Sequence, residues 1–310
     1  MTSLHLPGAL SRTLPFAIAG IVLSAVSICD ATAQSLKSGD LAPFEVVYEV
    51  GNNLINAGDA RLVLSNKANL WTYSLKIQPR GVFKLAGKGR ISEQSTFTLA
   101  GSDDNVQLQP QSYSYRQDDE RRRQVDASFD WANNAVTHKY RGKTVTETFD
   151  EPLLDRLTAT LLIMNTLRHD FQKVELPIFD SAKIKQVEFV NEGHETLQTR
   201  LGTIDTIRVT NHNAIGGSRQ TITWFAPSLD YLPVKIEHKK RDELVVRLSL
   251  LSFENRVTSL ELGGALPVED SSADEEAEEV EVADEKVELE EILEVVVPDP
   301  VTETEPAKSE

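Results

Sequence analysis

The sequence predicts a mainly β protein: a large curved antiparallel sheet, closed as a barrel or open as a half-barrel, with one buried helix and a disordered acidic C-terminal tail. Apolar and polar residues alternate in short runs between Phe44 and Leu251. One segment, 150–168, has helical spacing instead, and acidic residues dominate the C-terminal end. The chain therefore divides into three parts: a signal peptide at 1–33, a β domain at 34–261 and a tail at 262–310.

The charge of the chain is concentrated in the tail. The 310 residues include 32 Lys and Arg against 48 Asp and Glu, a net charge of −16. Residues 262–310 contain 18 acidic and 2 basic side chains, whereas 34–261 contain 29 of each. A chain without a basic excess argues against nucleic-acid binding. The neutral segment is long enough to bury a core as a single domain without disulfides or metals.

The N-terminus has the pattern of a secretory signal peptide. Arg12 precedes Leu14–Ile28, an uncharged and largely apolar run of 15 residues, and Ala31-Thr32-Ala33 follows. A transmembrane helix needs about 20 apolar residues, whereas a shorter run before a small-x-small site is typical of a cleaved signal. We expect cleavage after Ala33, a periplasmic protein and no membrane span after cleavage.

Two alternatives stand beside a cleaved signal: an uncleaved membrane anchor, and a lipoprotein acylated at Cys29. A lipoprotein signal has a small residue immediately before the cysteine, and this chain has Ile28 there. Cleavage after Ala33 removes the single cysteine of the chain. The mature protein then has no thiol for catalysis, disulfides or metal binding.

The β domain begins with a clear two-residue period. Phe44, Val46, Tyr48 and Val50 alternate with polar residues such as Glu49, as expected for a strand with one wet face. The same period recurs at 60–64, 71–77, 106–108, 113–115, 125–131, 136–140, 187–189, 204–209, 222–224, 234–236 and 244–251. About ten or more strands in one sheet rarely stay flat, so we expect a curled sheet.

One segment breaks this period and predicts a helix from Pro152 to Arg168. Asp150 is placed to cap the helix, and proline suits the first turn. The residues with helical spacing are Leu154, Leu157, Leu161 and Met164. Leu153, Leu162 and Ile163 widen this apolar stripe. We therefore expect the helix to be buried on more than one side, within or across the curved sheet.

The tail is rich in acidic residues and, from Val268 on, has no aromatic residue. Such a segment buries too little to offset its ordering entropy, so we expect it to be disordered. Leu289, Ile292, Leu293 and Val296 share one helical face within Asp284–Val297. The tail is thus interpreted as a solubilising segment or, alternatively, as a docking helix for a basic protein partner.

Three segments resemble the DUF3108 family of secreted bacterial proteins. They are Trp224–Glu237, Asn53–Ala60 and Glu195–Val209, in matching order over about residues 44 to 255. Where the family has an Asp-Pro-Leu-Ser-like helix start, this chain has Glu151-Pro-Leu-Leu154. The resemblance implies a curved antiparallel sheet similar to the periplasmic Lol-type lipoprotein carriers, and the family has no established activity.

No motif in the sequence predicts a reaction. Ser218 lacks the G-x-S-x-G context that exposes a nucleophile, and Gly87–Arg90 is only half of a phosphate loop. The histidines show no H-x-H or H-E-x-x-H spacing; they are His138, His169, His194, His212 and His238. We therefore expect no enzyme, no metal site and no cofactor, and we name no catalytic residue.

Two functions remain open, with an enzyme as a third alternative. The first is a binding protein that holds a lipid, an acyl chain or a lipidated protein in the concave face of the sheet, because curved sheets of this size enclose cavities. Its candidate lining residues are Trp71, Tyr73, Trp131 and Trp224, with Leu153 and Ile163 on the helix; each of the four aromatic residues also suits plain core. The second is a cell-envelope structural or adaptor protein, with a filled sheet and a tail that binds a partner.

Overall fold

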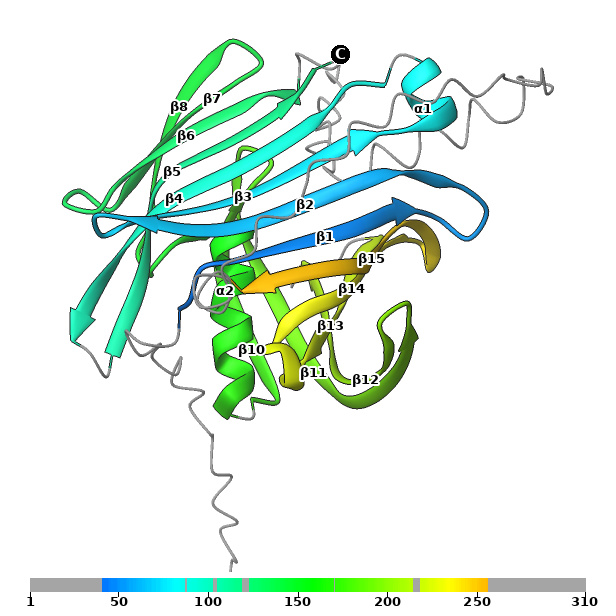
Figure 1. Ribbon diagram of the computed structural model, residues 1–310. Coiled ribbons are helices and arrows are strands. Elements are labelled where there is room, and N and C mark those ends of the chain that lie inside the picture. The colour runs from blue at the N-terminus through cyan, green and yellow to red at the C-terminus, as the bar shows by residue number, and fades with distance from the viewer. Residues whose placement is uncertain are drawn as a thin grey trace, which may run out of the picture. The chain divides into compact units, whose positions relative to one another are not determined.

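The computed structural model describes residues 41–86, 88–102, 105–118, 123–169, 171–213 and 218–255. In these ranges the chain forms one curved sheet of 15 strands with a helix inside the curve (Figure 1). The predicted mainly β fold with a curved antiparallel sheet is thus confirmed. The predicted signal peptide, its cleavage site and the acidic tail lie outside the described residues.

The strands follow one another as a meander with hairpin connections over most of the chain. Their bounds are β1 Phe44–Gly51, β2 Asn56–Lys67, β3 Leu70–Pro79, β4 Ile91–Ser102, β5 Asn105–Gln117, β6 Val125–Asp130, β7 Ala135–Tyr140, β8 Lys143–Thr148, β9 Leu154–Asp155, β10 Lys173–Asp180, β11 Lys183–Thr199, β12 Gly202–Asn213, β13 Arg219–Ala226, β14 Leu232–Lys240 and β15 Glu243–Asn255. The helical elements are α1 Gly81–Leu85, α2 Arg156–Thr166, and the short 3-10 helices Leu167–His169 and Pro227–Leu229.

The first and last strands lie side by side in the middle of the sheet. β1 pairs antiparallel with β2 on one side and with β15 on the other, so β2 to β8 form one wing and β14 to β9 the other. The edge strands β8 and β9 are not hydrogen-bonded to each other, so the sheet is open rather than closed. One pair departs from the expected antiparallel order, because β9 runs parallel to β10.

Four strands lie outside the segments in which apolar alternation predicts a strand: β4, β8, β9 and β10. The inward face of β4 carries Ile91, Glu93, Ser95 and Phe97, all buried, so two polar residues interrupt the apolar pattern. β8 is an edge strand with almost every side chain exposed, so neither of its faces requires apolar residues. Apolar alternation in the sequence predicts a strand only where one face of the strand is buried and apolar.

Helix α2 lies inside the curve of the sheet and packs against β3, β4, β5, β9 and β10 (Figure 1). Its residues Leu157, Ala159, Leu161, Ile163 and Met164 are all buried. They point in several directions around the helix axis, which a surface helix with one apolar stripe does not do. The prediction of a helix buried on more than one side is confirmed.

The predicted start of this helix is wrong. α2 begins at Arg156, and its cap is Asp155 rather than Asp150. The Asp155 carboxylate accepts hydrogen bonds from the backbone N–H groups of Leu157 and Thr158, at 2.9 and 3.0 Å. A cap residue is extended rather than helical, and Leu154–Asp155 accordingly pairs with β10 as β9. Pro152 therefore precedes a strand.

Aromatic side chains from the two wings of the sheet pack against one another. The Phe179 ring of β10 lies edge-to-face with Tyr113 of β5 and with Phe129 of β6, at 6.0 and 5.9 Å between ring centroids. His138 of β7 lies 5.3 Å from the same ring. Phe179 is fully buried. Side chains thus connect wings whose edge strands are not hydrogen-bonded to each other.

Candidate functional site

A cavity of about 550 Å³ lies between α2 and the concave face of the sheet. Its walls come from α2 and from strands β1 to β4 and β10 to β15. Cavities that hold small ligands measure about 300–1,000 Å³. The volume therefore suits a small molecule or an acyl chain.

Most of the wall is apolar. The apolar lining residues are Leu62, Leu75, Ile77, Leu157, Ala159, Ile163, Ile178, Val187, Phe189, Val209, Phe225, Pro233, Ile236 and Leu248. Strand alternation selects them: on β13, Thr223 and Phe225 face the cavity, and Trp224 between them lies on the other face of the strand. Such a wall favours a ligand with an apolar body.

Two buried tyrosines add hydroxyl groups to this wall. The Tyr48 hydroxyl donates a 2.7 Å hydrogen bond to the carbonyl oxygen of Pro233. The Tyr73 hydroxyl is buried and has no hydrogen-bond partner in the described part of the chain. Burial raises the pKa of both hydroxyls well above the usual value, so both keep their protons. Tyr73 thus lines the cavity, and its hydroxyl is a buried polar group without a partner in the described ranges.

A buried charge cluster anchors the first turn of α2 at the cavity. Arg156 donates from Nη2 to Glu93 Oε2 at 2.5 Å and from Nε to Glu93 Oε1 at 3.1 Å. Its Nε also lies 3.7 Å from Asp180 Oδ1, while Lys185 donates to Asp180 Oδ2 at 2.7 Å. Burial favours the neutral form of Asp180, but Arg156 and Lys185 hold its pKa below the usual value. Cations therefore hold both carboxylates at this end of the cavity.

The cap of α2 lies beside this cluster but outside the cavity wall. Ser95 donates a 2.5 Å hydrogen bond to Asp155 Oδ2, and Asp155 is fully buried. Burial raises the pKa of Asp155 to about 6, although hydrogen bonds from Ser95 and from the backbone of Thr158 oppose the rise. This hydroxyl–carboxylate pair joins β4 to the helix and has no path to a ligand.

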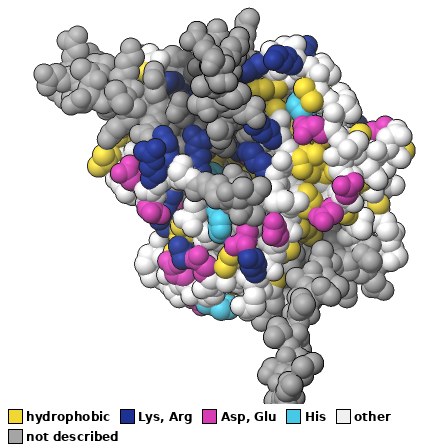
Figure 2. All heavy atoms as spheres, turned by 180° about the vertical axis from the view of Figure 1, so that it is seen from behind, with side chains coloured by type: hydrophobic (Ala, Val, Ile, Leu, Met, Phe, Trp, Pro, Cys, Tyr) yellow, Lys and Arg dark blue, Asp and Glu magenta, His cyan; other side chains and the backbone are white. Residues whose placement is uncertain are grey.

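The mouth of the cavity is rich in cations. Lys183, Lys185, Arg219, Lys239 and Lys240 line it at the ends of β11, β13 and β14. Figure 2 shows Lys and Arg side chains gathered around a hollow on the face opposite to that of Figure 1. The only carboxylates that line the cavity in the described ranges are Glu93 and Asp180, and cations hold both. The mouth therefore carries an excess of positive charge.

A histidine on the wall stays uncharged at neutral pH. His238 lines the cavity, and its Nδ1 lies 2.9 Å from the Thr221 hydroxyl. Burial and, second, the positive charge of Arg156 lower its pKa to about 4. His238 therefore adds a polar contact but no positive charge near pH 7.

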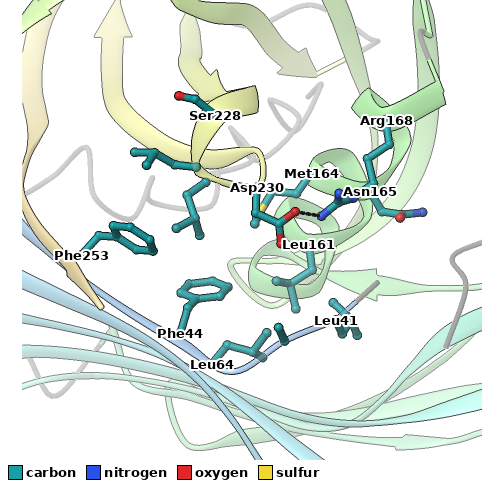
Figure 3. Close-up of a pocket in the computed structure, with 13 residues that line it drawn as sticks. Leu41, Phe44, Leu64, Leu161, Met164, Asn165, Arg168, Ser228, Asp230 and Phe253 are labelled. Carbon is teal, nitrogen blue, oxygen red and sulfur yellow. Dashed lines mark hydrogen bonds and ion pairs between the residues drawn. The ribbon is translucent and has the colours of Figure 1, made fainter. Parts of the chain in front are cut away.

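A second pocket, of about 180 Å³, lies at the C-terminal end of α2. Phe44, Leu161 and Phe253 point into it in Figure 3, and an ion pair between Arg168 and Asp230 lies at its edge. The Asn165 amide is buried and has no partner among the described residues. This pocket is below the size range of ligand cavities, so the larger cavity is the candidate site.

Two of the six residues predicted to line a ligand site lie on the cavity wall. They are Tyr73 and Ile163, whose contact with a ligand stays a prediction. Trp71 is not on the wall and stacks on Phe97 with 6.1 Å between ring centroids. Trp131 packs against Phe149 and donates to the Pro110 carbonyl oxygen at 2.7 Å.

The other two predicted residues lie elsewhere in the fold. Leu153 is fully buried in the core, but the cavity does not reach it. Trp224 is buried on the face of β13 away from the cavity, and its indole N–H donates to Glu195 Oε2 at 2.8 Å. The Lys235 ammonium group lies 4.1 Å from the ring centroid of Trp224. Trp224 is therefore a buried packing residue, which is the alternative to a ligand contact that the sequence analysis leaves open.

Sequence reasoning missed the charged residues of the site. Arg156 and Glu93 are 63 positions apart, and Lys183, Arg219 and Lys240 reach one mouth only through the register of the sheet. One pattern was available: Glu93 and Ser95 occupy alternate positions of β4, between the apolar residues Ile91 and Phe97. Buried polar residues in a strand require a partner from another element.

The described residues show neither a metal site nor a membrane-spanning helix. In these ranges, no three His, Cys, Asp or Glu side chains are grouped closely enough to hold a metal ion. Among the helices that the structure describes, none is long and apolar enough to span a bilayer.

Comparisons with known proteins indicate the family. No curated protein sequence matches the chain. A solved structure, the β-barrel-like protein of domain of unknown function DUF1849 from Brucella abortus, is similar with a TM-score of 0.45 and 10% identity, over 69% of this chain and 98% of that one. The sequence profile of the family described as "Protein of unknown function (DUF3108)" matches residues 44–243. The chain therefore belongs to the DUF3108 family.

Proposed function

We propose that this protein is a non-enzymatic periplasmic binding protein that holds an acyl chain in the cavity between α2 and the sheet. The observation that carries the proposal is the cavity of about 550 Å³, with its predominantly apolar wall. An empty apolar space of this size leaves its lining without contacts, which disfavours the folded state. An acyl chain in the cavity restores these contacts.

The arrangement of polar groups supports binding rather than catalysis. Arg156 and Lys185 hold Glu93 and Asp180 by hydrogen bonds, so both carboxylates are occupied in anchoring α2. The Asp155–Ser95 pair is fully buried behind the wall. The polar groups on the wall therefore position the helix and the ligand.

The cavity also favours a carrier over the alternative of a structural adaptor. An adaptor needs a rigid surface, and a sheet with a filled core provides one. Here buried apolar side chains such as Ile163, Phe225 and Leu248 line a cavity of about 550 Å³, so the space inside the curve is not completely filled. That costs stability, which a ligand-binding function explains and a purely structural function does not.

Native mass spectrometry of protein exported in its own cell and purified without detergent tests the proposal. We expect a polypeptide that begins at Gln34 and carries a lipid or fatty acid. The variant Thr223→Phe places a ring in the cavity, because Thr223 lines it, and should reduce the bound fraction. Thr144→Phe adds the same ring on exposed β8 and serves as the matched control.

Two results would contradict the proposal. A lipid-free wild-type protein that also fails to take up added fatty acid would favour the adaptor. Equal ligand occupancy in Thr223→Phe and Thr144→Phe would place the ligand outside this cavity.

A further inference from the structure

We propose that the cationic mouth of the cavity binds an anionic headgroup, so that the ligand is an amphiphile with one acyl chain and a carboxylate or phosphate. This inference rests on the proposed function and specifies the class of its ligand. Three features carry it: the position of the cations, the absence of an ion pair at two of them, Lys183 and Arg219, in the described ranges, and the apolar wall that adjoins them.

The cations converge because several hairpins end at the same edge of the sheet. Asp180 and Lys183 form the last pair of the β10–β11 hairpin, and Arg219 and Lys240 form a terminal pair of β13 and β14. All four line the cavity. The register therefore brings charges from distant parts of the sequence to one cavity. Figure 2 shows Lys and Arg side chains gathered on this face.

Two of these cations form no ion pair within the described part of the chain. Among the residues that the structure describes, neither Lys183 nor Arg219 has an ion pair or a side-chain hydrogen bond. Arg219 lies directly opposite Lys240 across the strand pair. Like charges in this position destabilise a sheet, although Glu243 faces Lys240 on its other side. An anion between Lys183 and Arg219 relieves this excess of positive charge.

Two neighbouring cations already have acidic partners, so the headgroup should bind at Lys183 and Arg219 instead. Lys185 is bound to Asp180, and Lys239 lies 3.9 Å from Glu237 Oε2. His238, just inside the mouth, is neutral at pH 7. Lys183 and Arg219 are the first residues of β11 and β13, and the apolar lining residues Val187 and Phe225 lie further along these strands. An anion at the two cations with a chain extending along the apolar wall matches both surfaces.

Calorimetric titration of the delipidated full chain tests this proposal with four probes of equal chain length: decanoate, decyl phosphate, decanol and decyltrimethylammonium. We expect decanoate and decyl phosphate to bind about tenfold or more tightly than decanol, because hydrogen bonds to an ionised group are about twice as strong as neutral ones. Added salt should weaken the two anions and leave decanol unchanged.

The double variant Lys183→Gln/Arg219→Gln should remove the preference for anions and keep the affinity for decanol. The control Lys67→Gln/Lys143→Gln makes the same change in net charge at exposed lysines that do not line the cavity, and it should retain the preference. The salt dependence of the wild-type protein gives a readout that does not depend on how well the variants fold.

The outcomes separate this inference from the proposed function. Decanol binding as tightly as decanoate, without salt dependence, would overturn the headgroup site and leave the acyl-chain site standing. Inorganic phosphate binding as tightly as decyl phosphate would identify a site for free anions and overturn the amphiphile. Failure of all four chain probes to bind would refute the proposed function together with this inference.

Discussion

Arg156, the first residue of α2, holds the buried carboxylate of Glu93 on β4 through two hydrogen bonds, the shorter of 2.5 Å. The Glu93 side chain has no solvent exposure. Asp180 of β10, in the other wing, lies 3.7 Å from the Arg156 Nε atom. A single guanidinium therefore links the helix to both wings of the sheet and fixes one end of the cavity.

The first prediction follows from this link. Arg156→Met leaves the Glu93 charge buried without its partner, which should lower the free energy of unfolding by about 3–5 kcal/mol. The double variant Arg156→Met/Glu93→Gln should recover part of the loss, since it also removes the stranded charge. Urea unfolding measures both.

The exposed pair Arg90–Asp118 offers a matched control for this variant. Both of its side chains are more than half exposed, so Arg90→Met should cost less than about 1 kcal/mol. A cost for Arg156→Met no larger than for Arg90→Met would show that the buried pair does not hold α2 in place.

The second prediction uses the two tyrosines of the cavity wall. Tyr73→Phe removes a buried hydroxyl without a partner, so the variant should be as stable as the wild type or slightly more stable. Tyr48→Phe removes the hydrogen bond to the Pro233 carbonyl oxygen and should lose about 0.5–1.5 kcal/mol. Urea unfolding of the lipid-free proteins compares them. Equal losses in the two variants would mean that the Tyr73 hydroxyl is hydrogen-bonded in solution.

The third prediction concerns pH and Asp155. The native pKa of about 6 lies above the usual 3.8, so the native state binds this proton more tightly than the unfolded chain does. The contribution of Asp155 to the free energy of unfolding should therefore fall by about 2–3 kcal/mol as pH rises from about 4 to about 6. Above pH 6 it should stay constant.

Asp155→Asn isolates this effect, because asparagine also caps helices and does not titrate. Groups such as Asp180 and Glu237 titrate in both proteins and cancel in the difference. We expect the wild type to lose stability relative to Asp155→Asn between pH 4 and pH 6 in urea unfolding. A difference independent of pH in that range would show that the Asp155 pKa is not raised.

The sheet could be predicted from the sequence where one strand face is dry, and the helix could be predicted from its spacing. The helix start could not, because Asp150 and Asp155 are both acceptable caps by residue type. The choice depends on β10, which pairs with Leu154–Asp155 as β9. A contact with a strand far along the chain therefore decided where the helix begins.

The candidate site was predictable to a smaller extent. On β13, Ile222, Trp224 and Phe225 are all buried, so both faces of the strand carry apolar residues. Alternation alone therefore does not show which face of β13 points toward the cavity. Trp224 lies on the face that points away from it. The mouth could not be predicted, because Lys183 and Arg219 line the same cavity only after all the strands between β10 and β14 take their register.

The fourth prediction concerns the tail, which contains the net charge of −16. Truncation after Glu261 should change the melting temperature by less than about 5 °C, the shift expected from about 1–2 kcal/mol. The reason is that the described fold already ends at β15, which pairs with both β1 and β14. Differential scanning calorimetry of both forms measures the change. A larger fall would mean that residues 262–310 pack on the sheet.

The last prediction separates a cavity-lining residue from a core residue. Ile163 and Leu153 are equally buried, but only Ile163 lines the cavity. Leu153→Thr places a hydroxyl in closed core and should lower the free energy of unfolding by about 2–4 kcal/mol. Ile163→Thr should cost less in the lipid-free protein, because its hydroxyl reaches open space, and should reduce the lipid retained. Urea unfolding and native mass spectrometry measure the two effects. A folded Ile163→Thr variant that carries as much lipid as the wild type would show that this face of α2 does not border the ligand.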